Sequence, residues 1–292
     1  MNVEGLGEQT NDVIFSENIL KNAKELQIEG KAPALPDISE ASQRNIGEQY
    51  VGFREQVLDA IKEVCSKNEY HNQNHTIEVE DRFEKLAKEA ALSDTEIMLG
   101  KIRAIFHDYG HAGRTIRQDV QINRDESNEE FAAVEAGKML KEWLRNKGLE
   151  EGKDDQIIAY VQFGILGTSF GQTSGKYERP YKPVDSADKL LAFADIGGFA
   201  KGFDGWMKES LNVFRETPFE NLPKDADDMI EKRKGFLKYI VAKFNEIKPL
   251  LNKQAAVDYE KQLKDVELGL NNRDTTEYYR KEFDTIRSAA EK

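Results

Sequence analysis

All the histidines of this chain lie in one short stretch. The 292-residue sequence contains four of them, His71, His75, His107 and His111. Random placement would scatter them, so their clustering within residues 70–115 indicates a shared task. Histidine is the commonest protein ligand for transition metals, and a neutral imidazole can also donate or accept a proton near neutral pH. The cluster therefore predicts a metal-dependent hydrolytic site.

The spacing of these residues suits binding of a metal at the ends of helices. His71 and His75 are four residues apart, as are His107 and His111, so each pair can project from one side of a helical turn. Asp108 follows His107 and points about 100° away around a helix, so the two can bind one metal only at a helix end or kink. Zinc, manganese and iron accept imidazole and carboxylate ligands together. A lone His-Asp pair is more often a core histidine with its partner, but two such clusters favour a site.

Helical patterns surround these residues and must position them. Apolar residues recur at three- and four-residue steps, and a helix is expected to hold His75 near its start. Ser93 opens a capping box that starts a further helix, with His107 at the end of that helix. A later helical pattern presents Asp195 just before a Gly-Gly pair.

The sequence predicts an all-α fold, a compact multi-helix bundle around the metal site, because no stretch shows sustained strand alternation. Residues 1–45 are expected to form a polar arm and linker, residues 46–250 a catalytic domain, and residues 251–292 helices that pack on or extend it. The glycine- and proline-containing segment 167–185 is interpreted as a functional loop.

Composition excludes several classes of partner. The formal net charge of −12 argues against polymeric nucleic acid, whose binding needs a basic surface. No apolar run approaches the roughly 18–20 residues that span a bilayer, and the start lacks the pattern of a signal peptide. Cys65 is the single cysteine, so no intrachain disulfide can form and a cytoplasmic location is the simplest expectation.

The candidate ligands resemble the signature of a known family. His75, the His107-Asp108 pair and Asp195 are similar in order to the H…HD…D pattern of the HD superfamily of metal-dependent phosphohydrolases. The resemblance covers roughly residues 50–200 in ordering and helical character, and its specific motifs are confined to short patches.

One branch of that superfamily is more similar than the others. Tyr-His-Asn-x-x-His at residues 70–75 and Phe-His-Asp-x-x-His at residues 106–111 resemble the metal-site motifs of class I cyclic nucleotide phosphodiesterases. Phe-Ala-Asp-Ile at residues 193–196 resembles the segment that carries that family's last metal ligand. The resemblance implies the helical fold of the HD and phosphodiesterase catalytic domains.

The resemblance also implies two divalent metal ions. His75, His107, Asp108 and Asp195 would hold the first, which would be zinc, manganese or iron. Asp108 would bridge to a second ion, magnesium or manganese, that is otherwise held mainly by water. A hydroxide between two cations would attack the phosphoester while both cations neutralise its charge.

Three further residues receive catalytic roles by position. His71 would protonate the leaving oxygen as general acid, and His111 would orient metal-bound water. Glu130 could match a family glutamate that contacts the bridging water, but it also fits a capping box opened by Ser127, and both interpretations stay open. Gln254 lies at the distance of the family's purine-binding glutamine without the surrounding pattern, which favours an ordinary exposed residue.

The implied function is metal-dependent hydrolysis of a phosphoester bond, in a nucleotide or cyclic nucleotide, so a small phosphorylated substrate is the expected partner. A nucleoside triphosphate or alarmone phosphohydrolase of the same superfamily is the alternative, although those enzymes need no Tyr-His-Asn-x-x-His element. A metal- or nucleotide-binding sensor without turnover is a third interpretation. No histidine follows His111 and no Gly-Tyr-Pro occurs, which disfavours branches that bind the second metal through further histidines. The oligomeric state stays open.

Overall fold

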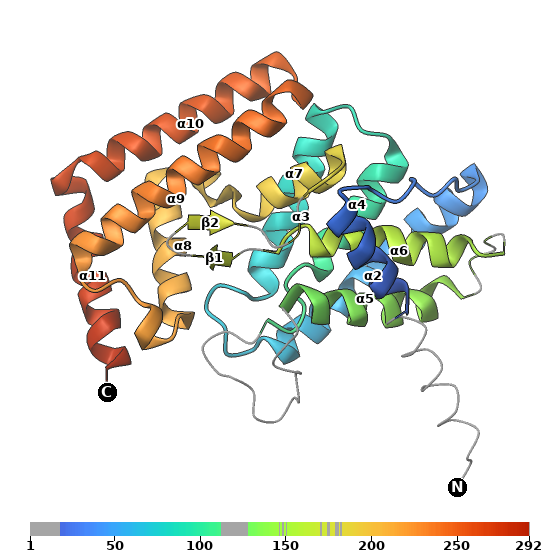
Figure 1. Cartoon of the computed structure of the whole chain (residues 1–292), viewed down its shortest axis with the longest axis horizontal. Helices are drawn as coiled ribbons and strands as arrows, with labels where there is room; N and C mark the ends of the chain where they lie inside the picture. Colours follow the sequence, from blue (N-terminus) through green and yellow to red (C-terminus); the bar gives the residue numbers. More distant parts are fainter. Residues whose placement is uncertain are drawn as a thin grey trace, which may run out of the picture.

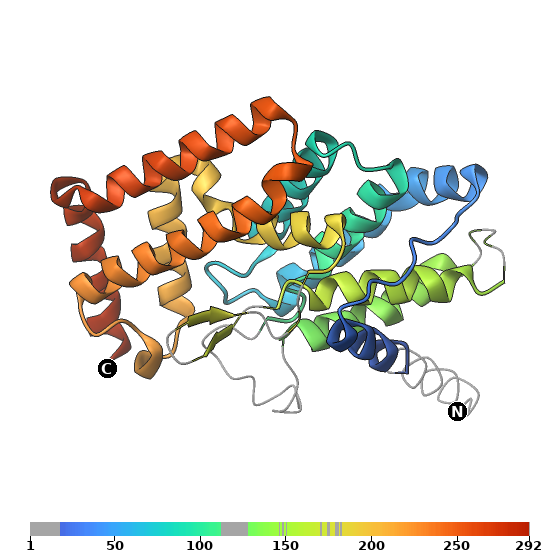
Figure 2. The ribbon, with the colours of Figure 1, turned by 45° about the horizontal axis from the view of Figure 1, so that its top comes forward.

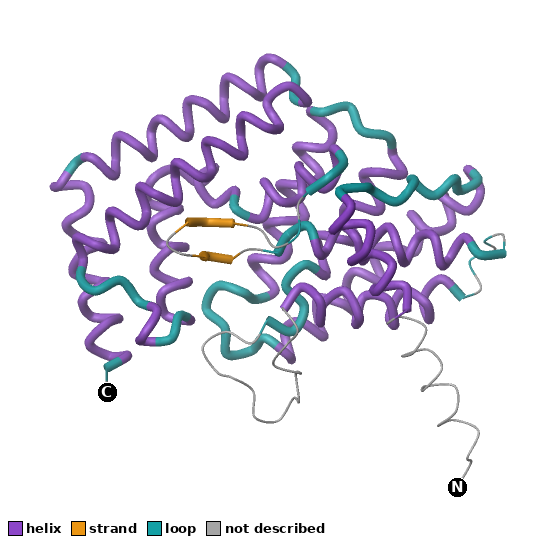
Figure 3. Tube along the Cα trace, viewed as in Figure 1, coloured by secondary structure: helices purple, strands orange, loops and turns teal. Residues whose placement is uncertain are grey.

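Helices account for nearly all of the regular structure (Figures 1 and 3). The computed structural model describes residues 18–111, 128–145, 147, 149, 151–169, 171–173, 176–178, 181 and 183–291. In these ranges the expected all-α class is confirmed, and one two-stranded ribbon accompanies the helices.

The helices have these bounds in chain order. Residues 18–29 are helical, and the α-helices after them are α2 (Glu40–Val64), α3 (Gln73–Glu89), α4 (Asp94–Phe106), α5 (Asn128–Leu144), α6 (Lys153–Leu166), α7 (Ser186–Asp195), α8 (Gly202–Glu216), α9 (Ala226–Ile247), α10 (Lys253–Asn271) and α11 (Arg273–Ala290). Short 3-10 helices occupy Gly197–Lys201, Phe219–Asn221 and Lys248–Leu250.

Polar caps determine where the helices of the site begin. The Asn72 side chain caps α3 and accepts a hydrogen bond from the backbone N–H of His75 at 3.4 Å. Ser93 and Glu96 form the reciprocal capping box at the start of α4, as the sequence predicts. Asp185 caps α7. These side chains satisfy N–H groups that have no partner inside the helix.

Two apolar clusters form the interior. The first unites α3 with α7, α8, α9, α10 and α11, and the second unites residues 18–29 with α2, α5 and α6. Helix α4 supplies Ala104 to the first cluster and Phe106 to the second. In Figures 1 and 2, α8–α11 lie on one side of the molecule and α2, α5 and α6 on the other. Helices α3, α4 and α7 lie between the two sides.

The central helices α3 and α4 pack very closely. A Cβ atom built on Gly100 of α4 would lie 2.0 Å from the ring of Phe83 on α3, so this crossing accepts no side chain at position 100. Both Phe83 and the neighbouring Leu99 are fully buried. The backbones that carry the first three candidate ligands are therefore held in one arrangement.

The expected functional loop contains a small sheet. Strand β1 (Gly171–Thr173) pairs antiparallel with β2 (Lys176–Glu178), with Gln172 opposite Tyr177. At the chain's later end, α10 and α11 share the first apolar cluster with α7–α9. At its earlier end, α2 begins at Glu40, ahead of the boundary expected at residue 45. No helix in the described ranges combines the length and apolar character needed to cross a membrane.

Candidate metal centre

The four candidate metal ligands come together from three helix ends. His75 lies in the first turn of α3, His107 caps the C-terminus of α4 with Asp108 directly after it, and Asp195 is the last residue of α7. Each offers a ligand atom, and these atoms all lie within 4.8 Å of one another. Adjacent residues inside a helix point about 100° apart. His107 and Asp108 lie where α4 ends and the backbone leaves helical geometry, so their side chains can point into the same space.

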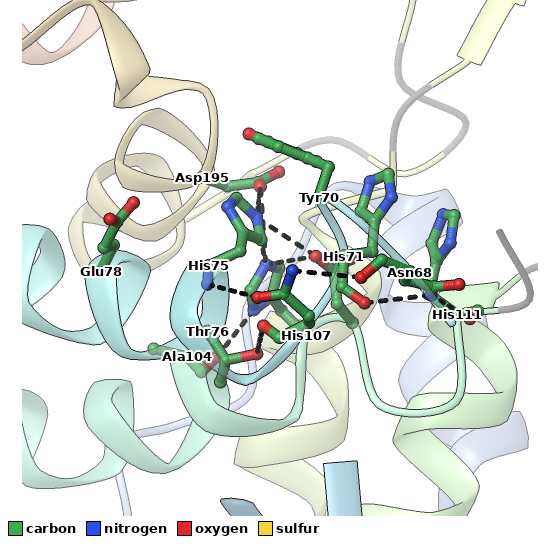
Figure 4. Close-up of polar contacts among 12 residues, drawn as sticks. Asn68, Tyr70, His71, His75, Thr76, Glu78, Ala104, His107, His111 and Asp195 are labelled. Carbon is green, nitrogen blue, oxygen red and sulfur yellow. Dashed lines mark hydrogen bonds and ion pairs between the residues drawn. The ribbon is translucent and has the colours of Figure 1, made fainter. Parts of the chain in front are cut away.

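The side chains of His75, His107 and Asp195 point toward one another (Figure 4). His107 Nδ1 lies 2.7 Å from the carbonyl oxygen of Ala104, which assigns the proton to Nδ1 and leaves a lone pair on Nε2. His107 Nε2 is 2.9 Å from Asp108 Oδ2 and 3.4 Å from His75 Nε2. Asp195 Oδ1 lies 3.4 Å from the same nitrogen of His75. Lone pairs therefore point into a common space.

The charges of the group fit a bound cation. His75 and His107 are buried, with 4% and 1% exposure, and the carboxylates beside them are largely enclosed. Burial lowers the pKa of His107, but the Asp108 carboxylate outweighs it and holds that pKa well above its ordinary value. Burial alone would raise the pKa of Asp108. The charge of His107 outweighs burial and holds the pKa of Asp108 well below its ordinary value. The group thus requires positive charge, so its residues fit a divalent metal ion.

His71 lies beside this group and has an acidic partner. Its Nδ1 is 2.5 Å from Oε2 of Glu216, the last residue of α8. The other oxygen of Glu216 accepts the backbone N–H groups of Tyr70 and His71, which fixes the carboxylate. Burial lowers the pKa of His71, but the Asp108 charge and the hydrogen bond that His71 donates to Glu216 outweigh it, so the pKa lies above its ordinary value. His71 is therefore prepared to carry a proton.

His111 stacks on His71. The two ring centroids are 3.6 Å apart and the planes differ by 12°. The Asn68 side chain binds the carbonyl oxygens of His111 at 2.8 Å and His71 at 3.0 Å, which holds both loops together. Burial and the neighbouring His71 charge lower the pKa of His111 to about 3, so its ring stays neutral.

This second group is less suited to a metal than the first. Donor atoms of His71, His111 and Glu216 also lie within 4.8 Å of one another. In nearly parallel stacked rings, however, the nitrogen lone pairs run side by side and do not converge on one point. The hydrogen bond between His71 and Glu216 is the better account of that geometry.

A pocket of about 530 Å³ opens over both groups. Asp108, Asp195 and the two stacked histidines line it on the side of α3, α4 and α7. Trp206 from α8 and Phe236 from α9 form an aromatic wall whose rings are parallel within 4°, with centroids 6.5 Å apart. The candidate ligands therefore face a cavity large enough for a small molecule.

Glu130, in the first turn of α5, contacts residues outside the candidate metal group. Its Oε1 accepts a hydrogen bond from the Tyr181 hydroxyl at 2.6 Å, and its Oε2 pairs with Lys24 at 2.9 Å. The adjacent Glu129 lines the pocket. Ser127, which would open the expected capping box, lies outside the described residues, and the catalytic role of Glu130 stays a prediction.

Sequence reasoning missed Glu216. It follows His71 by 145 residues and ends a helix of ordinary amphipathic pattern, so no local signal marks it. Gln254, on α10, binds Asp258 at 2.9 Å on the exposed surface, in keeping with its expected ordinary role. The only available clue to Glu216 was chemical, since a histidine that keeps its proton benefits from a nearby carboxylate.

Comparison with known proteins adds no further identification. No protein-family model, no curated protein and no solved structure matches this chain. The likeness to the HD superfamily therefore depends on the short motifs quoted above. What is shown of the site is a His/Asp group, His75, His107, Asp108 and Asp195, that could hold a metal ion.

Proposed function

We propose that this protein is a metal-dependent phosphohydrolase that cleaves a phosphoester bond in a nucleotide-like substrate. One observation carries the proposal: a buried group of two imidazoles and two carboxylates opens into the same pocket as a histidine that is hydrogen-bonded to a carboxylate. The first group suits divalent cations, and the second suits proton transfer.

Each residue of the site has a defined chemical task in this proposal. His75, His107, Asp108 and Asp195 hold the metal. Divalent cations bound there would lower the pKa of water and neutralise the charge of the phosphate.

His71 supplies the proton that the leaving oxygen needs. Glu216 retains the hydrogen on Nδ1 and stabilises the charged ring, so the Nε2 proton of His71 passes to the leaving alkoxide as the phosphoester bond breaks. The neutral His111 ring supports His71 from one face without adding a repelling charge. This division of tasks favours a diester, whose leaving group is a poor one without protonation.

The shape of the pocket supports a nucleotide-like substrate. Its volume lies within the range of about 300–1,000 Å³ that is typical of small-molecule sites. Trp206 and Phe236 give one wall of the pocket an aromatic, apolar character that suits a planar base. A nucleoside triphosphate or alarmone would use the same metal group, so the assay includes both.

The proposal is tested with purified protein loaded with Mn²⁺ or Mg²⁺. We expect hydrolysis of bis-p-nitrophenyl phosphate, or of a nucleotide in a panel that includes cAMP, nucleoside triphosphates and alarmones. Loss of activity with EDTA and recovery on adding metal would establish the metal requirement. Tight binding of a nucleotide without turnover of any substrate would instead support a sensor and overturn the proposal.

Two variants separate the metal group from the proton donor. We expect His71→Ala to retain bound metal and to lose about 10²–10⁴-fold in kcat, the usual contribution of general acid catalysis. Asp108→Ala should lose both metal and activity. Metal analysis by mass spectrometry, together with kcat on a diester with an alkoxide leaving group, measures both effects. A metal-free His71→Ala protein would contradict the assignment.

A further inference from the structure

One face of helix α8 lines the pocket. Four residues at the three- and four-residue steps of a helical face belong to the pocket wall, namely Trp206, Glu209, Ser210 and Val213. Three of them are uncharged, whereas Glu209 brings a carboxylate into the wall with a side-chain exposure of 14%. Glutamate is rarely enclosed unless it is paired. The contacts of its two oxygens therefore decide what Glu209 does.

One oxygen of Glu209 has a counter-ion within the chain. Its Oε1 lies 2.6 Å from Nζ of Lys201, and the same ammonium group lies 2.5 Å from Oε2 of Glu78. Glu78 Oε2 is also 3.7 Å from Nη1 of Arg82, so two cations serve these two carboxylates. A ligand that meets Glu209 need not bring a positive charge. It needs a hydrogen-bond donor, because an ionised carboxylate only accepts hydrogen bonds.

The other oxygen of Glu209 lies close to the backbone beside the metal group. A Cβ atom built on Gly198 would lie 1.8 Å from Glu209 Oε2, so the carboxylate occupies the space that a side chain at position 198 would need. Gly198 lines the pocket and follows the candidate ligand Asp195 by three residues. Among the described residues, no N–H or O–H group donates to Glu209 Oε2. This oxygen therefore remains an acceptor for a ligand in the pocket.

Glu209 lies between the two parts of the pocket that the proposed substrate would occupy. Its carboxylate adjoins the segment after Asp195, at the metal group that would hold the reacting phosphoester. Its backbone is about one helical turn from Trp206, in the aromatic wall that suits a base. Glu129, the other carboxylate that lines the pocket outside the metal group, stands on α5. In a nucleotide the sugar joins phosphate to base, so a sugar hydroxyl is the donor expected at Glu209.

We infer that Glu209 selects the sugar of the substrate by accepting a hydrogen bond from one of its hydroxyl groups. The inference rests on the proposed function and narrows its substrate class to nucleotides in which that hydroxyl is free. A hydrogen bond to an ionised acceptor is roughly twice as strong as a neutral one. A substrate without the hydroxyl would leave the carboxylate enclosed without its donor, which is how a polar site rejects such an analogue.

The test uses three diesters that differ only in their sugar hydroxyls. They are adenosine 5′-(p-nitrophenyl phosphate) and its 2′-deoxy and 3′-deoxy forms, and release of p-nitrophenolate reports each reaction in metal-loaded protein. We expect kcat/KM to fall about 10-fold or more for the form without the bound hydroxyl, the usual effect of losing one hydrogen bond to a charged group. The form that falls identifies the hydroxyl. Equal kcat/KM values for all three diesters in the wild type would refute the inference.

Substitution of Glu209 should remove this preference. In Glu209→Leu the ratio of the kcat/KM values for the ribose and deoxy diesters should fall to about one. Glu209→Gln keeps an accepting oxygen without the charge, so it should retain part of the preference. The matched control is Glu78→Gln, which removes the other carboxylate at Lys201 from outside the pocket lining and should keep the wild-type ratio.

The ratio separates recognition from a structural role of Glu209. Each ratio compares two substrates within one protein, so a general loss of folded or metal-loaded enzyme cancels. An unchanged ratio in Glu209→Leu would refute the inference and leave the proposed function standing.

A binding measurement decides the question independently of turnover. AMP should raise the melting temperature of metal-loaded wild type more than 2′-deoxy-AMP or 3′-deoxy-AMP does, and the difference should disappear in Glu209→Leu but not in Glu78→Gln. Should no phosphoester be hydrolysed, the proposed function fails, while this comparison still supports or refutes Glu209 as the residue that binds the sugar.

Discussion

The task of a single residue at this site depends on its neighbours more than on its type. His75 and His71 are both histidines near the start of α3, yet one faces two carboxylates across 3.2–3.4 Å and the other bonds to one carboxylate at 2.5 Å. A shared acidic group suits His75 to binding a metal ion, whereas a carboxylate partner of its own suits His71 to the proton transfer proposed for it. Glu216 is therefore the residue that distinguishes the environments of the two histidines.

The pairing of His71 with Glu216 predicts a pH-dependent stability difference. The pKa of His71 is raised above 6.5 and that of Glu216 is lowered below 4.5, so the pair stabilises the fold fully between those values. Its contribution is lost as pH rises through the raised pKa of His71, or as pH falls through the lowered pKa of Glu216. In metal-free protein, Glu216→Gln should therefore cost about 1–3 kcal/mol near pH 5.5 and clearly less near pH 9.

Urea unfolding of both proteins at the two pH values measures this difference. Glu220→Gln, which removes an exposed carboxylate close by in the chain, is the control and should show little change at either pH. An equal loss of stability for Glu216→Gln at both pH values would show that the pair is not ionised in the folded state.

At the scale of helices, one ion pair links α4 and α7, whose C-terminal ends lead to the acidic candidate ligands. Arg103 lies on α4, one turn before His107, and Asp188 lies on α7, two turns before Asp195. The guanidinium Nη1 is 2.7 Å from Asp188 Oδ1, and both side chains have no solvent exposure. A fixed contact so close to the ligands sets how α4 lies against α7.

Helix α6 encloses this ion pair. The Nε and Nη2 atoms of Arg103 donate to the carbonyl oxygen of Tyr160 at 3.1 and 2.7 Å. A Cβ atom on Gly164 would lie 2.3 Å from Arg103 Nε, so only glycine leaves room for the guanidinium. Burial opposes the charge of Arg103, but Asp188 outweighs it and raises the pKa of the arginine above its ordinary value. Arg103 is thus charged, and each of its three guanidinium nitrogens has a hydrogen-bond acceptor.

Breaking the ion pair should weaken both the fold and the metal site. Asp188→Asn leaves a buried guanidinium without its counter-ion and should cost about 3–5 kcal/mol in unfolding free energy. Replacing both residues with apolar ones, Arg103→Met with Asp188→Leu, should recover much of that stability, because buried ion pairs contribute little relative to apolar packing. Metal affinity should nevertheless stay weakened in the double variant, since the helices lose their fixed register.

Calorimetric titration with Mn²⁺ and chemical unfolding separate the two effects. Lys88→Met is the control, because it breaks an exposed pair with Glu84 and should cost less than about 1 kcal/mol. Metal affinity in the double variant that equals the wild-type value would show that Arg103 and Asp188 serve stability alone.

Local signals in the sequence were sufficient for much of the site but not for its supports. His75, His107 and Asp195 could be placed at helix ends because a cap or a break in apolar periodicity marks each of them. The structure brings them together with Asp108 in a group that could hold a metal ion. Arg103 and Asp188 could not be recognised as buried, because a charged residue inside a helix ordinarily predicts an exposed face. Their burial depends on a contact across 85 residues of sequence, which periodicity does not encode.

For the whole molecule, the metal group lies where the two apolar clusters meet. Helix α4 belongs to both clusters, α3 and α7 belong to the first, and the candidate ligands occur at the ends of these helices. The all-α class followed from the sequence because helical periodicity is local. The meeting of two clusters did not, because it depends on which apolar faces pair after the chain has folded.

Metal binding should therefore stabilise the whole fold. A cation that binds only the native state adds RT ln(1 + [L]/Kd), about 2.7 kcal/mol at 100 times Kd, and should raise the melting temperature. His75→Ala should abolish this gain. The exposed Asp227→Asn variant should retain it, since its carboxylate bonds Arg280 and is not among the residues that line the pocket. Scanning calorimetry with and without Mn²⁺ tests the prediction, and equal gains in wild type and His75→Ala would refute it.

The enclosed arginine of α4 also provides a way to recognise distant relatives. The buried ion pair, the glycine beside it and the candidate ligands form a spaced sequence pattern. It consists of Arg-x-x-x-His-Asp at residues 103–108, a glycine at 164, and Asp-x₆-Asp at residues 188–195. Arg103, Gly164 and Asp188 are set by the packing and charge of the buried ion pair, and His107, Asp108 and Asp195 are the candidate metal ligands beside it. Chains that preserve the whole pattern are expected to share this architecture even where the pocket residues, and the molecules they bind, have changed.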